Sequence, residues 1–183
     1  MMKTGIKRDA AKRNSFDRLT QFYESYNREL MAYALYFTRN EEDAVDALQE
    51  TFCLAMEDLY NDIAKQVENP KAWLMRIARN VMLRRQTRAR QEAILWRKKS
   101  ESDMKQNNFT FEILNGVLAD DILSFIRINY ASSVIEVFIL RHIHEMNLAE
   151  IAEVTGLPMT TIHRLLEKIT NDVQHKFCSA SGE

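Results

Sequence analysis

The segment over residues 147–166 constrains the fold most strongly, because it has the spacing of two helices joined by a tight turn. Asn147 is a good N-cap residue, and Glu150 stands three residues later, where a carboxylate can reach back to free backbone amides. Gly156 suits the left-handed position that ends a helix, and Pro158 suits the first turn of the next helix. The segment therefore predicts a helix-turn-helix, although an ordinary helical hairpin has the same spacing.

The second helix of this motif separates apolar from polar side chains. Its buried stripe is expected to hold Ile162, Leu165 or Leu166, Ile169 and Val173. Its polar faces carry groups that can meet base edges and phosphates, namely Thr160, Thr161, His163, Arg164 and Lys168. Because Glu167 opposes these few cations, the attraction to phosphate is expected to be weak.

The composition predicts an all-α protein. The 183 residues include only Gly 4 and Pro 2, while 46% are hydrophobic, so turns are scarce and helices are long. No apolar run approaches the length of a membrane span, and the basic N-terminus lacks the apolar core of a secretory signal. Cys53 and Cys178 lie far apart without zinc-ligand spacing. These features predict a cytoplasmic protein without membrane insertion.

The pattern of apolar residues divides the chain into five parts. We expect a basic, frayed tail over residues 1–15, a helical domain over 16–90, a polar linker over 91–111, a second helical domain over 112–177 and a short tail over 178–183. The first domain is expected to contain three helices. The second of these follows the N-cap residue Asn40 and is expected to bury Val45, Leu48, Phe52, Met56 and Leu59.

Charge is strongly segregated, although the net charge is only −1. Residues 41–68 contain nine acidic residues and one lysine, which gives a net charge of −8. Residues 71–99 contain ten basic residues and one glutamate, which gives a net charge of +9. Neighbouring blocks of opposite sign indicate two surfaces for two different partners. A pair of helices joined by solvated salt bridges explains the same charges, so both interpretations stay open.

Three motifs resemble bacterial extracytoplasmic-function sigma factors of the sigma-70 family. Residues 43–52 read DAVDALQETF, residues 70–80 read PKAWLMRIARN, and residues 134–142 read VIEVFILRH just before the helix-turn-helix. The motifs stand in the family's order, with a linker of family-like length between the second and the third. The resemblance implies two small helical promoter-binding domains on a flexible linker. It also implies a role as the dissociable subunit that directs RNA polymerase to promoters.

The resemblance assigns residues to three contact surfaces. Core RNA polymerase would be bound by Asp43, Asp46, Gln49, Glu50 and Phe52. The minus-ten promoter element would be opened and read by Trp73, Arg76, Arg79, Asn80, Arg84, Arg85 and Arg88. The minus-thirty-five element would be read by Arg141, Thr160, Thr161, His163, Arg164 and Lys168. An anti-sigma factor is a further partner known in the family, although no residue of this chain identifies one.

Three of these residues also fit structural roles. Phe52 and Trp73 each lie on an apolar helical stripe, so a role in the core is the favoured interpretation for both. Arg141 precedes the helix-turn-helix and fits a solvated surface position as well as a phosphate contact.

Nothing in the sequence predicts catalysis or a cofactor. There is no phosphate-binding loop, nucleophile elbow or paired-carboxylate site. His142 and His144 are two residues apart and point to different helix faces, so we predict no metal site. Two rival functions remain. A stand-alone helix-turn-helix regulator would leave the acidic and arginine-rich helices unused. A nuclease with metal ligands in residues 41–46 is disfavoured, because helix capping already explains those acids.

Overall fold

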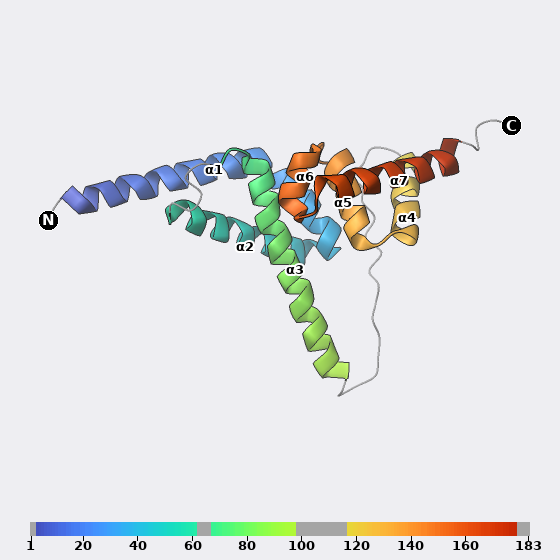
Figure 1. The fold of residues 1–183 in the computed structure, drawn as a ribbon. Coiled ribbons are helices and arrows are strands. Elements are labelled where there is room, and N and C mark those ends of the chain that lie inside the picture. Colours follow the sequence, from blue (N-terminus) through green and yellow to red (C-terminus); the bar gives the residue numbers. More distant parts are fainter. Residues whose placement is uncertain (1–2, 62–66, 98–116, 179–183) are drawn as a thin grey trace. The chain divides into compact units, whose positions relative to one another are not determined.

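The computed structural model describes residues 3–61, 67–97 and 117–178. All regular elements in these ranges are helices, which confirms the all-α prediction. The chain divides into two compact units, residues 1–109 and 110–183. The first unit contains α1 (Lys3–Thr38), α2 (Glu41–Tyr60) and α3 (Pro70–Arg97) (Figure 1). The second contains α4 (Val117–Asn129), α5 (Ser132–His142), α6 (Leu148–Thr155) and α7 (Met159–Cys178).

Two helices are longer than the sequence pattern predicts. Helix α1 begins at Lys3, so most of the segment predicted as a frayed tail is helical. No proline interrupts this stretch, and the Ser15 hydroxyl anchors it by donating a hydrogen bond to the carbonyl of Leu59 at 3.2 Å. Helix α3 continues to Arg97, so residues 91–97 of the predicted linker are also helical. Residues 98–111 lie outside the described ranges.

Helices α1 and α2 run antiparallel, as two contacts show. Ser15 meets the end of α2 at Leu59, whereas the ring of Tyr23 contacts that of Phe52, two turns earlier in α2, in a tilted arrangement with 5.0 Å between ring centres. The buried face of α2 consists mostly of small side chains, which allow close helix packing. These buried residues are Ala44, Ala47, Thr51, Ala55 and Leu59.

The predicted buried stripe of α2 was wrong at most positions. Val45 is exposed, and Leu48, Phe52 and Met56 are only partly buried, so Leu59 alone lies in the core as expected. The other large apolar residues stand beside the true contact face, where small side chains occupy every buried position except Leu59. Phe16 and Tyr23 of α1 are likewise at least half exposed at the edge of this contact.

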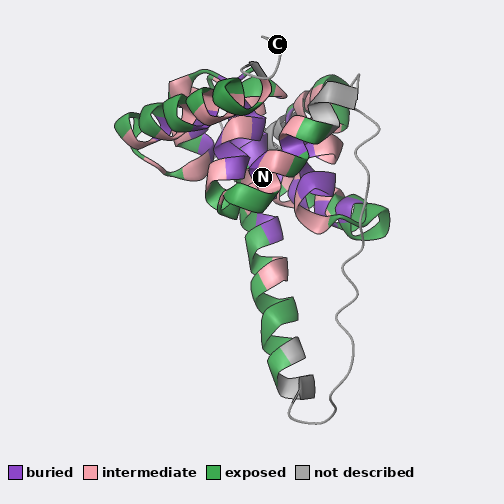
Figure 2. Cartoon of the chain, turned by 90° about the vertical axis from the view of Figure 1, so that its right-hand side faces the viewer, coloured by how far each residue is buried: buried purple, intermediate pink, exposed green. Residues whose placement is uncertain are grey.

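Helix α3 packs against α1 and α2 through its first half. The side-chain oxygen of Asn69 accepts a hydrogen bond from the backbone amide of Ala72 at 3.1 Å, and Pro70 occupies the first helical position. The core residues of this half are Ala72, Trp73, Leu74, Met75, Ala78, Val81 and Met82. Beyond Met82 the helix extends past the bundle and is largely exposed, as the green ribbon in Figure 2 shows.

The second unit contains the predicted helix-turn-helix in α6 and α7. Asn147 accepts hydrogen bonds from the amides of Ala149 and Glu150, while the Glu150 carboxylate accepts one from the Asn147 amide at 2.7 Å. This is a complete capping box. Gly156 ends α6 with φ 74, a left-handed conformation that costs a residue with a side chain more than it costs glycine. The sequence predicted both features.

The core of the second unit joins α7 to α5 and α6. Ile162 and Ile169 of α7 are fully buried, as predicted, whereas Leu165, Leu166 and Val173 are partly buried. The other buried apolar residues of this unit are Leu123, Ile126, Ile135, Val137, Ile139, Leu140, Met146, Ile151 and Val154. This packing leaves the opposite face of α7 open to solvent.

Candidate functional site

The acidic residues of α2 form an exposed face. Asp43, Asp46 and Gln49 are exposed, and Glu50 is partly buried. The helix follows an extended N-cap residue, Asn40, whose side chain accepts a hydrogen bond from the amide of Asp43 at 3.1 Å. Phe52 stands to one side of this face and packs on Tyr23, so it is neither fully buried nor free of the core.

An exposed polar stripe runs along α3. Arg76, Asn80, Arg84 and Arg88 follow one another at intervals of four residues, and all four are exposed. Successive positions at this spacing lie near one another on a helix surface. The stripe therefore offers guanidinium groups around an amide that can both donate and accept hydrogen bonds. Arg79 is partly buried beside it.

Trp73 is not part of this stripe. Its side chain is only 6% exposed, and its ring meets that of Phe22 edge-on at 6.2 Å between centroids. Because the ring is enclosed by the bundle, the structure favours the alternative interpretation of Trp73 as a core anchor over a contact with DNA.

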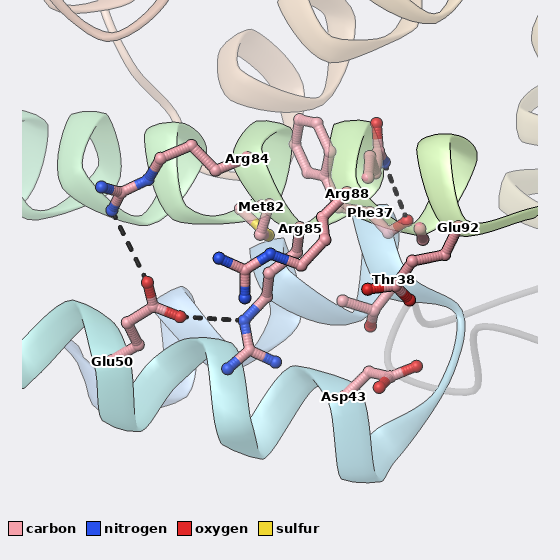
Figure 3. Close-up of a pocket in the computed structure, with 11 residues that line it drawn as sticks. Phe37, Thr38, Asp43, Glu50, Met82, Arg84, Arg85, Arg88 and Glu92 are labelled. Atoms are coloured by element: carbon pink, nitrogen blue, oxygen red, sulfur yellow. Dashed lines mark hydrogen bonds and ion pairs between the residues drawn. The ribbon is translucent and has the colours of Figure 1, made fainter. Parts of the chain in front are cut away.

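The two oppositely charged faces meet between α2 and α3. Arg85 Nε donates to Glu50 Oε2 at 3.0 Å, and Arg84 NH2 lies 3.6 Å from Glu50 Oε1 (Figure 3). A terminal nitrogen of Arg85 also lies 3.8 Å from Asp46 Oδ2. Glu50 thus pairs with two arginines, and part of each charged block is satisfied by the other. The interpretation as a salt-bridged helix pair therefore holds in part, and the interpretation as surfaces for two partners stays a prediction.

A hollow of about 530 Å³ adjoins these ion pairs. Figure 3 shows Arg85 and Arg88 extending from α3 into the space between that helix and α2. Its lining is Phe37, Thr38, Asp43, Glu50, Met82, Arg84, Arg85, Gln86, Arg88, Ala89 and Glu92. The three arginines face three carboxylates, so this space has no excess of either charge. It has the lining of a contact region between helices rather than of an anion pocket.

Helix α7, the second helix of the helix-turn-helix, presents most of its predicted contact residues to solvent. Thr160, His163, Arg164 and Lys168 are exposed, and Thr161 is partly buried. His163 Nδ1 lies 3.9 Å from a carboxylate oxygen of Glu167, one turn along the helix. These positions leave the side chains available for a partner.

Lys168 is placed by a neighbouring aromatic ring. Its ammonium group lies 5.7 Å from the ring centre of Tyr130, whose hydroxyl donates a hydrogen bond to Asp172. Burial, followed by this carboxylate, raises the pKa of Tyr130 to about 12. Tyr130 therefore keeps its proton and holds α4 to α7, a contact that no local sequence signal indicated.

Arg141 has a structural partner. A terminal nitrogen of its guanidinium donates to the carbonyl of Met146 at 2.9 Å, which ties the end of α5 to the loop before α6. Arg141 is also exposed, as expected for a solvated surface arginine. A second donor edge of the planar group can still meet a phosphate.

The two histidines beside this loop differ in their surroundings. His142 packs on Phe138 with 4.4 Å between ring centres, and burial, followed by the nearby Arg141 charge, lowers the pKa of His142. His144 is buried. Within the described ranges, no three His, Cys, Asp or Glu side chains are arranged to hold a metal ion.

None of the helices described here is long and apolar enough to cross a membrane.

Comparison with known proteins gives a family match for one region of the chain and a structural match for its fold. Residues 22–92 match the family model of sigma-70 region 2, which spans the acidic face of α2 and the arginine stripe of α3. The fold is similar to that of the sigma factor RpoE from Bartonella quintana, solved in complex with the anti-sigma factor NepR. That match has a TM-score of 0.62 at 20% identity and covers 85% of this chain and 94% of the other. A comparison with curated protein sequences gave no match.

The chain therefore carries a sigma-70 region 2 domain within the helical fold of a sigma factor. The region 2 match agrees with the resemblance to the sigma-70 family that was inferred from three motifs.

Proposed function

We propose that this sigma factor binds core RNA polymerase through α2, opens the minus-ten element with α3 and reads the minus-thirty-five element with α7. The main support is that the sigma-70 region 2 match includes both charged helices, and their exposed residues are those needed for a basic protein partner and for DNA. The helix-turn-helix of the second unit supplies a second DNA-binding element. No catalytic role or cofactor is proposed, and an anti-sigma factor is proposed as a further partner.

The acidic face of α2 suits a polymerase surface rich in lysine and arginine. Asp43, Asp46 and Gln49 are exposed on one side, and the partly exposed ring of Phe52 adds an apolar contact beside them. Interfaces commonly combine a desolvated aromatic group with complementary charges, which guide encounter and fix orientation.

The stripe on α3 suits a partly opened duplex. Arg76, Arg84 and Arg88 can contact backbone phosphates, while Asn80 lies among them as a group able to hydrogen-bond an unstacked base. Flipping a base costs on the order of a few kcal/mol, so the new contacts must offset this free energy.

Variants of α3 should separate phosphate binding from strand opening. Replacing Arg84 and Arg85 with alanine is expected to weaken promoter binding and reduce its salt dependence by about one unit of slope per lost phosphate contact. Asn80→Ala should change the slope less but reduce opening. Filter binding across a salt series and permanganate footprinting of the bubble, both with reconstituted holoenzyme, measure the two effects. Identical phenotypes for the two sets of variants would contradict this division of roles.

The second unit is expected to bind DNA weakly when it is alone. Only Arg164 and Lys168 are fully charged among the exposed contact residues of α7, and Glu167 opposes them. Few phosphate contacts give a low affinity at physiological salt. On polymerase, the same contacts become effectively intramolecular and require little intrinsic affinity.

A fragment of residues 111–183 tests this expectation and the stand-alone regulator together. We expect dissociation constants weaker than about 1 μM for duplex DNA at physiological salt, near the range of non-specific binding. Fluorescence anisotropy with upstream promoter duplexes measures them, and circular dichroism checks that the fragment is helical. Nanomolar, sequence-specific binding would favour the stand-alone regulator.

A further inference from the structure

The ion pairs between α2 and α3 join residues that the proposed function assigns to different partners. Glu50 and Asp46 belong to the polymerase-binding face, whereas Arg84 and Arg85 belong to the DNA-binding set. In the free chain Arg85 Nε is 3.0 Å from Glu50, which is closer than any contact of Arg84 with that carboxylate. The Glu50 carboxylate therefore pairs with two guanidinium groups that would otherwise be available to bind phosphate.

We propose that Glu50, supported by Asp46, is an internal competitor for DNA phosphate, and that docking on polymerase releases Arg84 and Arg85 to bind promoter DNA. This inference rests on the proposed function and describes how its two surfaces are coupled. A basic polymerase helix that takes over the carboxylates removes the partners of both arginines. By linkage, DNA that takes over the arginines frees the carboxylates and strengthens docking by the same factor.

The exposure of these side chains allows such an exchange of partners. The side chains of Arg84 and Asp46 are 61% and 57% exposed, and those of Arg85 and Glu50 are 37% and 39% exposed. They are open enough for a partner to reach and close enough to pair in its absence. Ion pairs of this exposure are weak, so the coupling should be modest, roughly two- to fivefold in an equilibrium constant.

The arrangement of the helices keeps the competition specific to these arginines. Arg85 lies on the side of α3 that faces α2, while Arg76 and Asn80 occupy the solvent-facing stripe nearer the start of the helix. Figure 3 shows Glu50 between the two guanidinium groups, with a dashed contact to each. The internal competition by Glu50 therefore affects only the part of the DNA-binding surface that contains Arg84 and Arg85.

The test on the DNA side uses the free, full-length chain and a fluorescein-labelled single-stranded oligonucleotide of mixed sequence. Glu50→Gln should bind this probe about two- to fivefold more tightly than the wild type at low salt, because the arginines are released. The gain should be lost when Arg84 and Arg85 are both alanine. Glu57→Gln is the matched control, since it removes an equal charge from an exposed site on the same helix.

The test on the polymerase side measures assembly of the full-length chain with core enzyme. Arg85→Ala should strengthen assembly about two- to fivefold, because it removes the closer of the two arginine partners of Glu50 and the arginine beside Asp46. Arg90→Ala removes the same charge from an exposed site of α3 that is assigned to neither surface, and it should leave assembly unchanged.

The outcomes separate this inference from the proposed function. If alanine at Arg84 and Arg85 weakens oligonucleotide binding but Glu50→Gln does not strengthen it, the internal competition by Glu50 is wrong and the DNA-binding role stands. The internal competition is also wrong if the gain in oligonucleotide affinity from Glu50→Gln persists without the two arginines, or if Glu57→Gln gives the same gain. If the arginine variants bind the oligonucleotide as the wild type does, the DNA-binding assignment itself fails.

Discussion

Replacing Asp43 and Asp46 together with lysine is expected to weaken assembly with core RNA polymerase by about 10- to 100-fold at moderate salt. Both carboxylates are exposed on α2, and reversal turns an attraction for a basic partner into a repulsion. The effect should shrink as salt is added, because exposed charges are screened beyond about 8–10 Å at 0.1–0.15 M. Titration of labelled sigma factor with core enzyme at two salt concentrations measures both quantities.

The matched control for this experiment is lysine at Glu42 and Glu57, two exposed acids of the same helix that are not assigned to the docking face. Circular dichroism must show unchanged helicity, because Asp43 lies in the first turn of α2, where a negative charge favours the helix dipole. Asp46→Lys also places a cation near Arg85, so Asp43→Lys alone is a necessary comparison. Wild-type assembly by the double variant would exclude this face as the docking site.

Much of the fold could be predicted because its signals are local. The capping box of Asn147 and Glu150, the left-handed Gly156 and the cap at Asn40 each depend on residues within a single turn. Scarce glycine and proline likewise predicted the all-α class. Features of this kind follow from backbone geometry and hydrogen bonding, which a short sequence window contains.

The buried face of α2 could not be predicted in the same way. The larger apolar residues Val45, Leu48 and Met56 suggested the core side, yet Ala44 and Ala47 are the residues buried there. Larger apolar side chains can bury more surface area, so the sequence pattern favoured them for the core. Where two helices pack closely, however, only side chains that fit between them are buried. The crossing distance depends on α1, so it is absent from the sequence of α2.

The pairing of Glu50 with arginines of α3 could not be predicted from a local sequence pattern either. Its partner Arg85 is 35 positions away, and charge blocks show only that attraction is available, not which side chains meet. The sequence left two interpretations of these blocks, separate surfaces or a salt-bridged helix pair. The fold shows the salt-bridged pair, and exposed acids and arginines remain on both sides of the paired residues for the proposed partners.

Trp73→Ala is expected to destabilise the first unit by about 3–5 kcal/mol, the usual cost of removing a large aromatic side chain from a core. Trp73 is almost completely enclosed and packs edge-on against Phe22 of α1, so truncation leaves a cavity between α1 and α3. Trp73→Phe keeps an aromatic ring at this contact and should cost less. Urea unfolding followed by circular dichroism, with the full-length chain, measures the difference.

Stability is the decisive measurement because loss of activity alone fits either role of Trp73. A core anchor predicts that Trp73→Ala lowers the urea midpoint and that promoter opening falls with the fraction of folded protein. A base-stacking tryptophan predicts an unchanged midpoint and reduced opening by fully folded protein. Asn80→Ala provides the contrast, since Asn80 is exposed and its loss should leave the midpoint nearly unchanged. An unfolding curve for Trp73→Ala that overlays the wild type would therefore contradict the core assignment and return this residue to the DNA-binding set.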